Sequence, residues 1–166
     1  MSYLLRRTRR GAWVGDKRSR DEAVFDYIRT DADTDGLSVF EVENDEQRSA
    51  VVAAIACERQ NTSRVDLLEV ERDAIERYGV VQNTPGKGTT PVPAANALHC
   101  SLDWDAETLR RFAEDLFAEG RAPREHSAAA VRAAVRRLDP VGVIGDEAQA
   151  FVRAERAKAA PSPEKP

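Results

Sequence analysis

The chain has 166 residues, of which 42% are hydrophobic and 33% are charged, and this excludes wholesale disorder and leaves room for one domain with its own core. The longest apolar run, residues 50–57, is far shorter than the roughly 20 residues of a membrane-spanning helix, and no signal peptide is predicted. We therefore expect a cytoplasmic protein without membrane contact. The excess of Arg over Lys suggests a bacterial source.

The two cysteines, Cys57 and Cys100, each lie within an apolar pattern. In a cytosolic protein such thiols are expected to be buried and reduced rather than joined as a disulfide.

The first half of the chain predicts strands alternating with helices. A strand is expected over 3–8, where apolar residues run into arginines as in an exposed or edge strand. Apolar residues at helical spacing predict a helix over 19–30. Residues 37–42 are β-prone, and Asn44 with Gln47 three positions later resembles a capping box that opens the next helix.

The second half begins with β-structure and ends in helices. Strands are expected over 64–70 and 97–103, separated by a loop rich in proline and glycine over 82–96. Asp105 predicts the N-cap of a helix with a complete apolar stripe, and Ser127 predicts the N-cap of another. A last helix is expected after these.

These elements predict an α+β fold. We expect a two-layer sandwich, in which helices cover a small sheet of about four strands, with a helical C-terminal extension. Alternation along the strands suggests that one face of the sheet meets solvent. Residues 1–158 are expected to form a single compact domain, predominantly helical from about residue 105, and residues 159–166 a disordered Pro-rich tail.

Charge is unevenly distributed, although the net charge is −4. Residues 1–20 carry seven basic side chains against one acidic side chain, whereas residues 31–46 carry seven acidic side chains and no basic one. Three interpretations follow: a basic arm for phosphates, an acidic loop for a cation, or two blocks that face each other. The third is favoured because opposite neighbours relieve repulsion within each block.

The arginine-rich start contains the candidate binding residues. Arg6, Arg7, Arg9 and Arg10 surround a turn and could hold phosphates, with Trp13 available for stacking. The acidic pI of about 5.3 argues against a dedicated nucleic-acid domain, because such domains usually have a strongly basic face.

Asp31, Asp33 and Asp35 form a candidate cation site. They occupy every second position before Gly36, as the carboxylates of a calcium loop do. The bidentate Glu expected at the twelfth position is replaced by Val42. We therefore favour local turn chemistry over calcium binding here.

A nucleophilic triad could be suspected at His99, Ser101 and Asp103. Successive side chains on one face of a strand stand roughly 6.6–6.8 Å apart, which is too far for the contacts of a triad. No catalytic residue and no cofactor are predicted.

Two classes of function follow. The first is a non-catalytic interaction or accessory protein that docks on a protein partner or on itself, using the helical third or an arginine-lined edge strand. The alternative is a small nucleic-acid-binding regulator that uses the Arg-rich segment. An enzyme whose site is assembled from distant positions leaves no local trace and stays open.

Overall fold

Six strands form one sheet in the part of the chain that the computed structural model describes, residues 1–16, 18–29 and 36–159. They are β1 (Tyr3–Arg7), β2 (Leu37–Val42), β3 (Val65–Glu71), β4 (Gln82–Asn83), β5 (His99–Leu102) and β6 (Arg124–His126). Their spatial order is β4-β5-β2-β1-β3-β6, and each pairing is antiparallel. The α+β class is confirmed, but the short strands β4 and β6 extend the predicted four strands to six.

Strand β1 lies inside the sheet, between β2 and β3. Leu5 pairs with Phe40 on one side and with Glu69 on the other. The prediction of an exposed or edge strand is therefore wrong. Arginines are tolerated at the end of this interior strand because Arg6 donates three hydrogen bonds to main-chain carbonyl groups.

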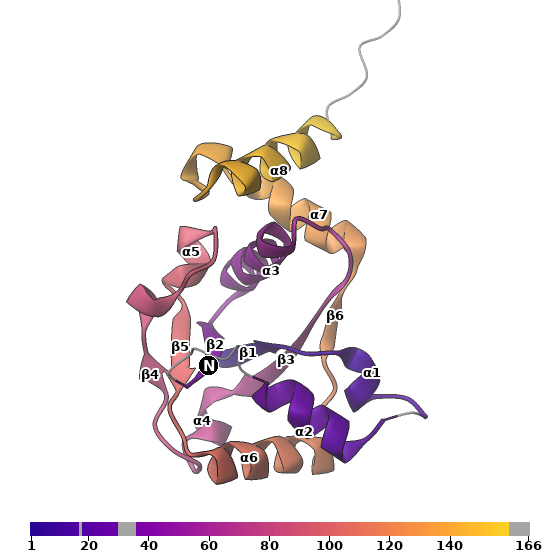
Figure 1. The fold of residues 1–166 in the computed structure, drawn as a ribbon, viewed down its shortest axis with the longest axis vertical. Helices are drawn as coiled ribbons and strands as arrows, with labels where there is room; N and C mark the ends of the chain where they lie inside the picture. Colours follow the sequence, from indigo (N-terminus) through magenta and orange to yellow (C-terminus); the bar gives the residue numbers. More distant parts are fainter. Residues whose placement is uncertain (17, 30–35, 160–166) are drawn as a thin grey trace, which may run out of the picture.

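Helices lie on both sides of the sheet (Figure 1). One side carries α3 (Asp45–Arg59), α5 (Pro93–Asn96), α7 (Ala128–Arg137) and α8 (Asp146–Ala157). The other side carries α1 (Arg10–Trp13), α2 (Arg20–Ile28), α4 (Arg72–Ile75) and α6 (Ala106–Ala118). Two short 3-10 turns complete the chain, η1 (Pro85–Lys87) and η2 (Pro140–Gly142).

Each face of the sheet has its own hydrophobic core. Neighbours along a strand point to opposite faces, so Leu4 packs into the core with α2 and α6, and Leu5 packs into the core with α3 and α7. Leu67 and Leu68 divide in the same way. The prediction of two layers with one solvent-facing side is therefore wrong: helices from the N-terminal half and from residues 106–118 cover the second face.

Three predicted helix starts are confirmed in detail. Asn44 accepts a hydrogen bond from the Gln47 N–H at 2.9 Å, and the Gln47 side chain accepts from the Glu43 N–H at 2.6 Å. Asp105 and Ser127 cap α6 and α7 through the N–H groups three residues later. Local side-chain chemistry thus sets these boundaries.

Replacing Asn44 with alanine is expected to lower the free energy of unfolding by about 1 kcal/mol, because the N–H of Gln47 loses its acceptor. Chemical denaturation measures the change. Asn44→Ser is the matched control, since serine caps as well as asparagine and should leave stability nearly unchanged. Equal losses in both variants would contradict the capping role.

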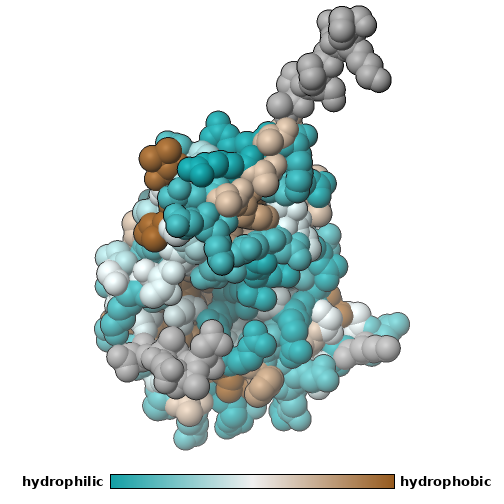
Figure 2. Space-filling view, turned by 45° about the horizontal axis from the view of Figure 1, so that its top comes forward, coloured by the Kyte–Doolittle hydropathy of each residue, from teal (hydrophilic) through white to brown (hydrophobic). Residues whose placement is uncertain are grey.

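The surface is mainly hydrophilic on the face shown in Figure 2, where apolar groups appear in separate places. Among the described residues the large exposed apolar side chains are Met1, Phe25, Val80, Val141 and Ile144. No helix within the described ranges is both long and apolar enough to cross a membrane. Of the predicted tail, residues 160–166 lie outside the described ranges.

Candidate anion-binding site

A cleft of about 290 Å³ opens where β1 leaves the sheet. It lies among the end of β1, the start of α1, the ends of α2 and α3, and the start of β3. We call it the arginine cleft, because its described lining contains six arginines: Arg7, Arg9, Arg10, Arg29, Arg59 and Arg64. Thr8, Gly11, Asp26 and Asp66 complete this lining. Six arginines against two aspartates give a formal charge of +4.

Three of these arginines concentrate positive charge without a carboxylate partner in contact. The guanidinium groups of Arg7 and Arg29 make no hydrogen bond or ion pair with any described residue, and Arg59 donates one long bond, of 3.3 Å, to the Ser63 hydroxyl. Burial, and then the charges of Arg59 and Arg29, lower the pKa of Arg7, although Glu58 and Asp26 act in the opposite direction. The three side chains therefore repel one another across a partly desolvated space.

The other arginines of the cleft are held by the protein. Asp26, which is 4% exposed, accepts from the Arg9 backbone N–H at 2.6 Å and from Arg9 Nε at 2.9 Å. Arg10 Nη1 donates to the Pro123 carbonyl at 2.8 Å. These contacts fix Arg9 and Arg10 to neighbouring elements at the wall of the cleft.

Two polar atoms at the base of the cleft have no hydrogen-bond partner among the described residues. They are Thr8 Oγ1 and Asp66 Oδ1, in residues that are 6% and 9% exposed. The strands hold them close together, because the Thr8 N–H donates to the Asp66 carbonyl at 3.1 Å. Buried groups of this kind cost free energy until a partner satisfies them. The Thr8 hydroxyl can donate to an anion, whereas Asp66 Oδ1 is an acceptor and needs a donor.

Two of the residues predicted for binding have structural roles instead. Arg6 donates from Nε to the Tyr27 carbonyl at 3.0 Å and from Nη1 to the Ser38 carbonyl at 2.7 Å, which ties the end of α2 to β2. Trp13 is 2% exposed, and its ring packs against Tyr27 and Phe117. The indole is therefore not a stacking platform at the surface.

Arg7, Arg9 and Arg10, which the sequence analysis proposed for binding, line the cleft. Arg29, Arg59 and Arg64 also line it and were not among the proposed residues. A signal was present for two of them. Arg29 and Arg59 stand at the C-terminal ends of predicted helices, where backbone carbonyls favour a cation. Alternation along β1 would also have separated Arg6 from Arg7.

The predicted metal residues Asp31, Asp33 and Asp35 lie outside the described residues. Two other members of the acidic segment pair away from the arginine-rich start, because Glu41 bonds with Arg72, and Asp45 with Arg48. Within the described ranges no group of three or more His, Cys, Asp or Glu could hold a metal ion.

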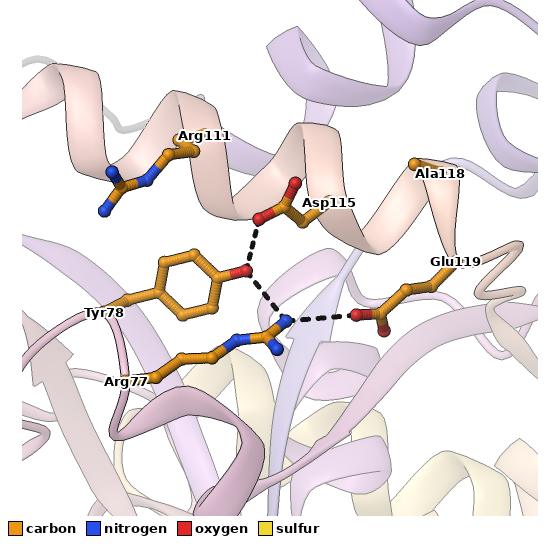
Figure 3. Close-up of a pocket in the computed structure, with 6 residues that line it drawn as sticks. All are labelled: Arg77, Tyr78, Arg111, Asp115, Ala118 and Glu119. Atoms are coloured by element: carbon orange, nitrogen blue, oxygen red, sulfur yellow. Dashed lines mark hydrogen bonds and ion pairs between the residues drawn. The ribbon is translucent and has the colours of Figure 1, made fainter.

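The charges of a second hollow, of about 620 Å³, largely neutralise one another (Figure 3). Arg77 Nη2 donates to the Tyr78 hydroxyl at 2.9 Å and to Glu119 at 3.1 Å, and the same hydroxyl donates to Asp115. The guanidinium of Arg111 lies 5.8 Å from the centre of the Tyr78 ring. This hollow therefore offers an anion less unbalanced positive charge than the arginine cleft does.

The two cysteines are held in their protonated form, and His99 and Ser101 have hydrogen-bond partners. Burial raises the pKa of both Cys57 and Cys100 to about 11, so each thiol stays protonated at neutral pH. His99 Nδ1 lies 2.8 Å from the Thr84 hydroxyl. The Ser101 hydroxyl does reach Asp103, because β5 ends at Leu102 and the chain turns back.

Comparison of the chain with protein-family models, with curated proteins and with solved structures gives no match.

Proposed function

We propose that this protein is a non-catalytic accessory protein that holds a phosphate-bearing group of its partner in the arginine cleft. The observation that carries the proposal is the convergence of Arg7, Arg29 and Arg59 without a carboxylate in contact among the described residues. Like charges in a partly desolvated cleft destabilise the protein until an anion neutralises them.

Phosphate suits this arrangement, because its oxygens can engage more than one arginine at once. A guanidinium presents paired donors that match two phosphate oxygens, and charge-assisted bonds of this kind are about twice as strong as neutral ones. The face shown in Figure 2 is mainly hydrophilic, so a partner that meets this face would be polar.

A nucleic-acid-binding regulator is the second candidate, because the same arginines could contact a phosphate backbone. The burial of Trp13 removes the stacking partner that this alternative would use for single strands. A nucleic acid would therefore depend on the cleft alone for its contacts.

Pyrophosphate titration by calorimetry tests the proposal. In the double variant Arg29→Ala/Arg59→Ala the affinity is expected to fall about 10-fold to 100-fold or more, because each lost charged hydrogen bond contributes roughly 1.5–3 kcal/mol. Both side chains are at helix ends and hold no buried carboxylate, so the variant should fold.

The matched control is Arg110→Ala/Arg153→Ala, which removes the same charge outside the cleft. Arg110 pairs with Glu114, and Arg153 with Gln149, each on the surface of its own helix. This control should change affinity less than threefold. An equal loss in both double variants, or no binding by the wild type at low salt, would refute the proposal.

A further inference from the structure

We propose that the arginine cleft selects a phosphate monoester in its dianionic form over a phosphodiester. This inference rests on the proposed function and names the ligand class of the same site. The relevant ligand is a terminal phosphate, whether on a small molecule or at the end of a nucleic-acid strand.

The positions of the cations give the first argument. Arg7 lies at the end of β1, Arg29 at the C-terminus of α2 and Arg59 in the last turn of α3, so three separate elements direct charge to one place. A backbone of successive phosphodiesters is instead followed by cations spread along a groove. Attraction grows with the product of the charges, so a dianion gains more here than a monoanion.

The size of the cleft gives the second argument. Its volume of about 290 Å³ lies just below the range for small-molecule sites, which is roughly 300–1,000 Å³. A phosphate with a compact group attached fits this space. A continuous strand would need room for a group on each side of the phosphate, and it would find the Trp13 ring buried.

The unpartnered hydroxyl at the base gives the third argument. Thr8 Oγ1 can rotate its proton toward an acceptor, and a monoester offers three terminal oxygens where a diester offers two. Three terminal oxygens can accept hydrogen bonds from the arginines and from this hydroxyl at the same time. Asp26 is engaged by Arg9, and Asp66 Oδ2 lies 3.3 Å from Arg64 Nε, which weakens the repulsion between these carboxylates and an anion. Asp66 Oδ1 has no partner among the described residues and opposes the anion, against the six arginines of the lining.

The affinity of the site should depend on pH because the ligand titrates, not because a side chain of the cleft does. The charged groups that face the ligand are the six arginines of the cleft, Asp26 and Asp66, with Glu58 near Arg7 and Glu125 near Arg64. Histidine is the side chain that ordinarily titrates between pH 5 and 8, and the described lining holds none. A monoester gains its second charge near pH 6, so its affinity should rise with pH.

Methyl phosphate and dimethyl phosphate are matched probes for this inference. By calorimetry, methyl phosphate should bind about tenfold more tightly at pH 7.5 than at pH 5, as its dianionic fraction rises from about a tenth to nearly all. Dimethyl phosphate should bind at least tenfold more weakly at pH 7.5 and show no such rise. Arg59→Ala should abolish the preference for the monoester, whereas Arg110→Ala should keep it.

Oligonucleotides with and without a 5′-phosphate distinguish the two sources of the ligand. Preference for the phosphorylated strand indicates a strand end, and binding of methyl phosphate without binding of either strand indicates a small molecule. Both results support the inference. Equal binding of the monoester and the diester at both pH values would overturn the inferred selectivity and leave the proposed anion binding intact. If none of these probes binds and pyrophosphate does not bind either, the selectivity and the proposed anion binding are both refuted.

Discussion

Replacing Trp13 with alanine is expected to lower the free energy of unfolding by about 3–5 kcal/mol. The indole is 2% exposed and lies edge-on to Tyr27, with ring centres 6.1 Å apart, and close to Phe117. Helix α1 has four residues, so this ring is its main anchor to α2 and α6. The melting temperature should fall by roughly 6–20 °C in a chain of this size.

Two controls separate this effect from the general loss of a tryptophan. Trp104 is half-buried and donates its N–H to the Val80 carbonyl, so Trp104→Ala should cost clearly less. Trp13→Phe keeps an aromatic ring and removes an indole N–H that has no partner among the described residues, so it should cost about 1 kcal/mol or less. A loss below 1 kcal/mol for Trp13→Ala would show that α1 is held by other contacts.

The same substitution links the core to the arginine cleft. Arg9 and Arg10 precede Trp13 on the segment that the indole fixes, and both line the cleft. Trp13→Ala should therefore weaken pyrophosphate binding even at temperatures where the variant stays folded. Trp13, proposed from the sequence as a contact for the ligand, is thus expected to act on the site through packing.

Local signals in the sequence predicted the helices well, since each depends on neighbours within a few positions. Asn44, Asp105 and Ser127 cap helices in the structure as expected, and Gly120 follows α6 with a φ of +71°. Such contacts form before any tertiary structure is needed. Because the helices could be recognised from such local signals, the α+β class could be predicted. The number of layers depends on how the helices pack on the sheet, and local signals do not give it.

The missed strand positions and the cleft depend on pairing between distant segments. Strand β6 has the sequence Arg-Glu-His, which has no apolar alternation, and it exists because Val65 pairs with His126 and Leu67 with Arg124. The interior position of β1 follows from its two partners rather than from its own residues. The arginine cleft is of the same kind, because its lining comes from separate segments between residues 7 and 66.

Replacing Arg48 with methionine is expected to be the most damaging change of charge in the described structure, with a loss of about 3 kcal/mol in the free energy of unfolding. Arg48 is 9% exposed and binds both carboxylate oxygens of Glu69, at 3.0 and 3.3 Å. Removing the guanidinium leaves the negative charge of Glu69 under α3. Arg124 neutralises this charge only weakly, because it lies 3.7 Å away and its side chain is 55% exposed.

The double variant Arg48→Met/Glu69→Leu shows whether the pair stabilises the fold or merely avoids an uncompensated charge. Removing both charges should restore most of the stability lost in Arg48→Met, because desolvation costs a buried ion pair about as much as its attraction gains. Urea denaturation of the wild type, both single variants and the double variant measures this coupling. If the double variant is as unstable as Arg48→Met, the guanidinium holds α3 on the sheet through contacts beyond Glu69, with Asp45 at the start of the helix as the next partner to test.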